Sequence, residues 1–174
     1  MHRTLFFSPA LIITLALSTY AADGTINFTG TILDAACTVD PGSANQTVPM
    51  GSVNKASFTN VGDLASSGPI VITVNACDPS ITRVAARFEG TEAAGNSQIL
   101  ALTPGGATGV GIGIFEADGT TLVPLNTKSV GIVAPAAGAS ADLNFVAKYV
   151  ATAANADITA GDANSVATFT LDYN

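Results

Sequence analysis

The chain has no tryptophan, one histidine and only two cysteines among its 174 residues. The histidine is His2, which lies in the N-terminal segment that we predict below to be cleaved. The mature chain then has no histidine for a Ser-His-Asp or Cys-His catalytic arrangement, so it is not expected to be an enzyme. Two cysteines are too few for a structural zinc site, and no cofactor motif is present. Lys and Arg total 6 against 13 acidic residues. A chain this acidic is not expected to bind nucleic acid through its phosphates.

Glycan binding by a secreted domain is harder to exclude, because sugar sites commonly use aromatic platforms. Three tyrosines and no tryptophan are available. Tyr149 and Tyr173 share the parity of the apolar residues in their segments, which favours a packing role. A self-contained secreted glycan-binding β-sandwich stays open as an alternative.

The first residues have the pattern of an export signal. A short basic start at residues 1–3 is followed by an apolar run over 4–17, and Thr19-Tyr20-Ala21 places small residues where a signal peptidase cleaves. We therefore predict a cleaved signal peptide over 1–21. The run is too short for a permanent span, so no membrane span is expected in the mature form.

The two cysteines, Cys37 and Cys77, would reach an oxidising compartment in an exported chain. A disulfide between them is the expected outcome. It would close a loop of about forty residues and stabilise the fold by about 3–4 kcal/mol in the chain-entropy model.

Short segments of alternating apolar and polar residues recur through the chain, with Gly, Pro, Asn and Ser between them and no sustained helical period. This pattern predicts one antiparallel, immunoglobulin-like β-sandwich over 34–174. The glycines of 105–113 lack the lysine of a phosphate loop and predict a loop that enters a strand. A turn is expected at Asp40-Pro41-Gly42. The expected strands lie around 70–74, 84–88, 110–114, 122–125 and 143–149.

The two ends of the mature chain carry the clearest alternation. The last fourteen residues, 161–174, predict a strand, and no further segment follows to cover its edge. An uncovered apolar edge needs a partner. Residues 22–33 predict a spare strand whose apolar face consists of Gly24, Ile26, Phe28, Gly30 and Ile32.

Several short motifs, in this order and spacing, resemble those of the chaperone–usher pilins, and in particular of the type 1 fimbrial (major) subunit family. They are Gly30 seven residues before Cys37, the segments 35–39, 48–53 and 75–78, Phe58, the segment 145–149, and a C-terminal pattern of Gly161, Phe169, Leu171 and penultimate Tyr173. The resemblance covers essentially the whole mature chain.

The resemblance implies an incomplete immunoglobulin-like (pilin) sandwich that lacks its last strand and is completed by donor-strand complementation. It implies a structural subunit that polymerises head to tail by donor-strand exchange to build the shaft of an adhesive fimbria, and a minor or adaptor pilin is the alternative. The partners implied are neighbouring subunits, a periplasmic chaperone and an outer-membrane usher, with export through the periplasm to the cell surface. The residues implied to line the groove and dock the chaperone are Gly161, Ala167, Phe169, Leu171 and Tyr173.

Overall fold

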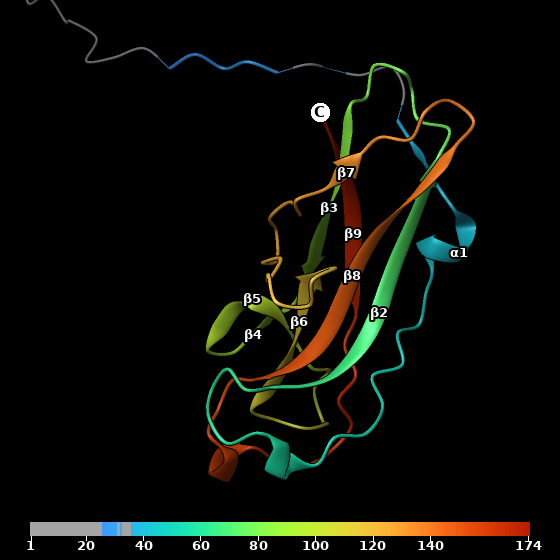
Figure 1. Cartoon of the computed structure of the whole chain (residues 1–174). Helices are drawn as coiled ribbons and strands as arrows, with labels where there is room; N and C mark the ends of the chain where they lie inside the picture. Colours follow the sequence, from blue (N-terminus) through green and yellow to red (C-terminus); the bar gives the residue numbers. More distant parts are fainter. Residues whose placement is uncertain (1–25, 31, 33–35) are drawn as a thin grey trace, which may run out of the picture. The chain divides into compact units, whose positions relative to one another are not determined.

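The computed structural model describes residues 26–30, 32 and 36–174 (Figure 1). Residues up to Ile32 and residues from Leu33 onward form two separate units, and each is described by itself. The predicted signal peptide, 1–21, and Gly24 lie outside the described residues.

The larger unit consists of two antiparallel sheets, as the alternating pattern predicts. One has six strands in the order β1-β2-β8-β6-β5-β4, and the other has three in the order β7-β3-β9. In Figure 1 the long β2 and β8 run side by side, with β3 and β9 behind them. The strands are β1 (Thr38–Val39), β2 (Leu64–Asn75), β3 (Arg83–Gly90), β4 (Glu92–Ala93), β5 (Asn96–Ala101), β6 (Val110–Glu116), β7 (Ile132–Val133), β8 (Ser140–Ala151) and β9 (Ala167–Tyr173).

The core lies between the two sheets and is formed by the alternate residues that the sequence marks as apolar. Phe88 of β3 meets Phe145 of β8 edge to face, with ring centroids 5.0 Å apart. Such a pair adds to the free energy gained from burial and fixes the two sheets against each other. The largest fully buried side chains of this core are Ile72, Leu143, Val74 and Val84, whereas Ile99 is buried in a second, smaller cluster with Ala93, Phe115 and Val150.

The predicted disulfide is confirmed. Cys37 and Cys77 are bonded and both side chains are buried. The bond joins the residue before β1 to the second residue after β2, so it fastens the start of the sandwich to the end of the strand with which β1 pairs.

Two local predictions were wrong, and a third, the turn at Asp40, is confirmed in the form of a helical turn. Residues 122–125 form no strand; Leu122 makes a single bridge to Phe115, although Val123 and Leu125 are buried. Residues 161–166 are irregular, and the last strand begins only at Ala167. The turn expected at Asp40 opens a short helix, α1 (Pro41–Ala44), whose first turn is capped by the Asp40 carboxylate. Two further single turns are 3-10 helices, η1 (Lys55–Ser57) and η2 (Asn155–Asp157).

Candidate functional site

The last strand, β9, lies at the edge of its sheet. It pairs with β3 along its whole length, from Val84 opposite Tyr173 to Gly90 opposite Ala167. Within the part of the chain that the structure describes, no strand pairs with its other side. The edge expected from the sequence is therefore present.

The hydrogen-bond pattern shows which backbone groups this edge exposes. Arg83 and Asn174 exchange two backbone hydrogen bonds, both 3.1 Å long. In an antiparallel pair of strands, residues that are hydrogen-bonded to the partner, as Asn174 is to Arg83, alternate along the strand with residues whose N–H and C=O point away from the partner. The residues of β9 that point away from β3 in this way are Tyr173, Leu171, Phe169 and Ala167.

The side chains of β9 follow the same alternation. Phe169, Leu171 and Tyr173 are half-buried and pack on the core, whereas Thr168 and Thr170 are exposed. Burial raises the pKa of the Tyr173 phenol. One face of the strand thus belongs to the core while its backbone edge stays open.

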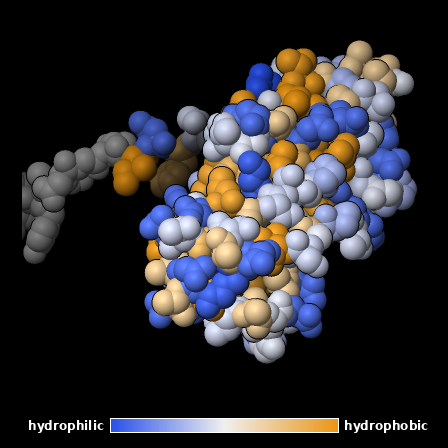
Figure 2. All heavy atoms as spheres, turned by 60° about the horizontal axis from the view of Figure 1, so that its bottom comes forward, coloured by the Kyte–Doolittle hydropathy of each residue, from blue (hydrophilic) through white to orange (hydrophobic). Residues whose placement is uncertain are grey.

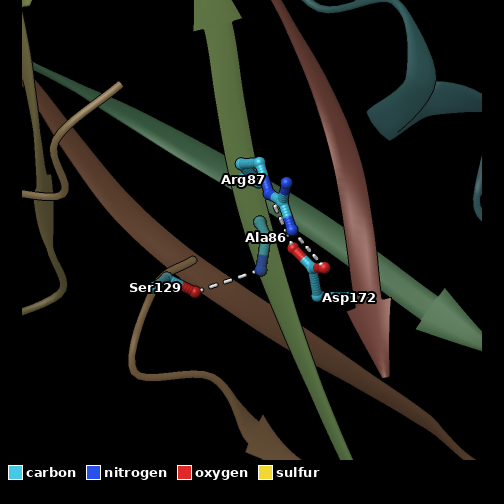
Figure 3. A network of polar contacts seen from close by, with 4 residues as sticks. All are labelled: Ala86, Arg87, Ser129 and Asp172. Carbon is cyan, nitrogen blue, oxygen red and sulfur yellow. Dashed lines mark hydrogen bonds and ion pairs between the residues drawn. The ribbon is translucent and has the colours of Figure 1, made fainter. Parts of the chain in front are cut away.

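The outer face of β9 is fixed to β3 by an ion pair (Figure 3). Arg87 donates to both carboxylate oxygens of Asp172, over 3.1 and 2.6 Å. On the other side of β3, Ser129 accepts from the Ala86 N–H through its hydroxyl and donates its own N–H to the Ala86 carbonyl. That edge of β3 is therefore filled by the chain itself, in contrast to the edge of β9.

A hollow of about 700 Å³ lies along the open edge. Residues 163–169 form one wall and 43–51 form the other. Its floor is the core of the sandwich, reached between the walls. The floor residues are Ile70, Phe88, Leu100, Ile112, Ile114, Ala147 and Tyr149. We call this hollow the groove.

The wall formed by 43–51 is attached to β2 by side chains. The Gln46 amide donates to the Val71 carbonyl over 3.1 Å and accepts from the Val71 N–H over 3.4 Å. The Ser43 hydroxyl accepts from the Thr73 N–H over 3.0 Å. These side chains occupy the edge of β2, and no backbone–backbone hydrogen bond of the described chain involves 45–51. The Met50 carbonyl accepts from the Ser66 hydroxyl, but the other backbone groups of 45–51 and the outward-facing groups of β9 have no hydrogen-bond partner within the described residues, so they are free to pair with an inserted strand.

The wall formed by 163–166 is held from below, although it belongs to no strand. The Tyr149 hydroxyl donates to the Ala163 carbonyl over 3.1 Å, and the Ser165 hydroxyl donates to the Ala101 carbonyl over 2.6 Å. Burial raises the pKa of Tyr149. The wall thus has a defined position without a neighbouring strand.

Only some of the residues predicted to line the groove do so in the structure. Ala167 and Phe169 line the groove, whereas Leu171 and Tyr173 lie beyond its lining, with the Tyr173 hydroxyl 3.5 Å from the Cys37 carbonyl. Gly161 packs against the loop at Gly106. Sequence reasoning missed the wall at 43–51, because an irregular segment gives no alternating signal.

The smaller unit carries the predicted donor residues. Ile26, Phe28 and Ile32 are 77, 91 and 99 % exposed, and open space surrounds Gly30. Solvent exposure of three large apolar side chains within seven residues is unfavourable in an isolated chain. The face of the molecule in Figure 2 otherwise shows apolar residues interspersed with polar ones.

No helix among the described residues has the length and apolar character needed to cross a membrane. In the same residues, no three His, Cys, Asp or Glu side chains gather closely enough to hold a metal ion.

These features define a class: a β-sandwich with one strand position unfilled and a groove in its place. The model of the family "Fimbrial protein" matches residues 26–174, and the chain belongs to this family. Long polar fimbria protein A of Salmonella typhimurium is 39 % identical over 179 residues, 99 % of this chain and 97 % of the relative. The "probable major fimbrial subunit LpfA" of Escherichia coli O157:H7 is 34 % identical over 178 residues, 99 % of this chain and 97 % of the relative.

Among solved structures, the P pilus rod subunit PapA superposes with a TM-score of 0.66 at 23 % identity, over 80 % of this chain and 100 % of that one. This likeness confirms the predicted pilin fold. The chain is a structural subunit of a surface fimbrium, and membership of this structural family confirms the expectation that it is not an enzyme.

Proposed function

We propose that the subunit polymerises head to tail by donor-strand exchange, and that it forms the shaft of the fimbria. Residues 22–33 of one copy fill the groove of the next. The observation that carries this proposal is the groove between β9 and 45–51, along which no strand of the described chain pairs with the groove side of either wall, in a chain that also exposes an alternating apolar segment. The shaft role is supported by similarity to a probable major subunit.

Two contributions hold the inserted strand. Its backbone pairs with the free groups of β9 and of 45–51, which is β-augmentation. Its alternate side chains, Ile26, Phe28 and Ile32, cover the apolar floor, and burial of each contributes about 1.5–3 kcal/mol. Gly24 and Gly30 share this face and allow the backbone to approach the floor closely where no side chain is needed.

Before assembly, the groove needs a temporary occupant, because an open apolar edge promotes aggregation. We assign this role to a periplasmic chaperone that adds a strand along β9 and is guided by Phe169, Leu171 and Tyr173. An outer-membrane usher then presents the next subunit. The predicted signal peptide over 1–21 supports passage through the periplasm.

Thermal unfolding tests the proposal directly. A chain that begins at Leu33 is compared with and without a peptide of residues 22–33. We expect a large rise in melting temperature, with release of the peptide too slow to follow over hours. A chain that is already stable and monomeric, and that ignores the peptide, would mean that the sandwich is complete without a donor.

A further inference from the structure

The wall at 163–166 depends on a close crossing of two loops. One loop, 103–108, follows β5, and the other, 159–164, leads toward β9. The Ala107 N–H donates to the Asp162 carbonyl over 2.8 Å, and the Thr103 N–H donates to the Asn164 carbonyl over 2.7 Å. Two backbones therefore run in direct contact at the end of this wall of the groove.

Two glycines make this contact possible, one from each loop. A Cβ atom on Gly106 would lie 2.0 Å from the Asp162 carbonyl oxygen. A Cβ atom on Gly161 would lie 2.8 Å from both the Ala107 nitrogen and the Gly106 carbonyl carbon. The obstructing atoms belong to the backbone, so they cannot move aside as a flexible side chain could.

Backbone conformation does not explain these glycines. Neither Gly106 nor Gly161 is among the glycines with positive φ. Each position therefore requires glycine because of the space at the crossing and not because of its dihedral angles.

The crossing lies two residues before the wall begins at Ala163. If a methyl group separated the loops, the two backbone hydrogen bonds would lengthen and the wall would move relative to the floor. Ser165 and Tyr149 hold the wall from other points, so the change would be local.

We propose that Gly106 and Gly161 are positioning residues that set the wall of the groove and thereby the lifetime of the inserted strand, an inference that rests on the proposed function. The role that the family resemblance implies for Gly161 is direct recognition by a chaperone. The crossing gives Gly161 a different task, which it shares with a residue of another loop. The two roles make different predictions for Gly106.

The test measures release of a fluorescent peptide of residues 22–33 from full-length mature chains after refolding with the peptide. Every chain carries Phe28→Asp, so that it can accept a strand but not donate one. Gly106→Ala and Gly161→Ala are each expected to shorten the half-life of the bound peptide at least tenfold. Gly138→Ala is the control for general destabilisation, because the positive φ of Gly138 strains an alanine there while the space around it is open and the residue does not line the groove. The half-life of the peptide bound to this control should stay within twofold of that on the parent chain.

Hydrogen exchange separates positioning from general destabilisation. In the two test variants, protection should fall at the amides of Thr103 and Ala107 and persist in β2 and β8. Equal loss of protection throughout would overturn the proposal, and so would a Gly106→Ala chain that holds the peptide as long as its parent does. If an alanine variant of either glycine does not fold, Ser165→Ala is used instead, because it removes another contact that holds the same wall. This variant should shorten the half-life of the bound peptide at least threefold. An unchanged half-life of the peptide on Ser165→Ala would also overturn the proposal. If the parent chain binds no peptide, the proposed function itself fails.

Discussion

Replacement of Phe28 by aspartate tests the donor face most sharply. Phe28 is 91 % exposed in the single chain, so the change should cost little before assembly. In the groove it removes about 1.5–3 kcal/mol of apolar burial. It also places a carboxylate over an apolar floor, which costs about 1–3 kcal/mol more even if the group takes up a proton. The total is about 2.5–6 kcal/mol, or roughly sixtyfold to twenty-thousandfold weaker insertion.

The assay is polymer formation by purified subunits, followed by electrophoresis of unboiled samples and by electron microscopy. Phe28→Asp should form no ladder of polymers, yet it should still bind a peptide of residues 22–33, because its own groove is intact. Asn27→Asp is the matched control, since it adds the same charge on the opposite face of the strand and should polymerise within a fewfold of the parent rate. Fibres of normal length from Phe28→Asp would refute the assignment of the donor face.

Three further predictions concern the sandwich. Cys77→Ser should lower the free energy of unfolding by about 3–4 kcal/mol, measured by denaturant titration, because the disulfide closes a loop of about forty residues; an unchanged midpoint under non-reducing conditions would contradict this. Hydrogen bonds from Thr121 and Thr120 lower the pKa of Asp118 to about 2. A carboxyl whose pKa is depressed by folding stabilises the fold above its unfolded pKa, near 4, and loses that contribution as pH falls toward 2; Asp118→Asn should therefore show a smaller loss of melting temperature over this range than the parent does. Tyr173→Ser should reduce recovery of subunit from the periplasm, because the chaperone is expected to dock on this strand, and an unchanged yield would count against that role.

The sequence allowed most of the long strands to be predicted, but little of the groove. Alternation located β2, β3, β8 and β9, in which the residues of one face are the more buried. It also located β6, although both faces of that strand are buried, because glycine alternates with isoleucine there. The short strands β1, β4 and β7 have two residues each, too few to show a period. At 122–125 burial without strand pairing gave a false signal, because apolar residues fill the core whether or not their backbone joins a ladder.

The groove itself depends on contacts between distant segments. The Gln46 amide meets Val71, and Gly106 meets Asp162, so neither contact leaves a mark at short range in the sequence. Gly161 shows the difference clearly. The family resemblance drew attention to this residue, but only the structure identifies the backbone that it must approach.

The open edge of β9 differs from the edges of β3 and β2, because other parts of the chain make hydrogen bonds to those two edges. The edge of β3 opposite β9 is covered by β7 and Ser129, and the edge of β2 beyond β1 is occupied by the side chains of Ser43 and Gln46. Along β9 and 45–51, in the part of the chain that the structure describes, backbone groups without a strand partner face a common apolar floor, an exposure that natural proteins normally avoid. The segment proposed to fill this groove, 22–33, belongs to the same chain but is a different surface from the groove. After each addition, the growing polymer therefore still has a free groove at one end and a free donor segment at the other. Contacts of this kind do not close on themselves as a two-fold dimer does, so the product is an open filament.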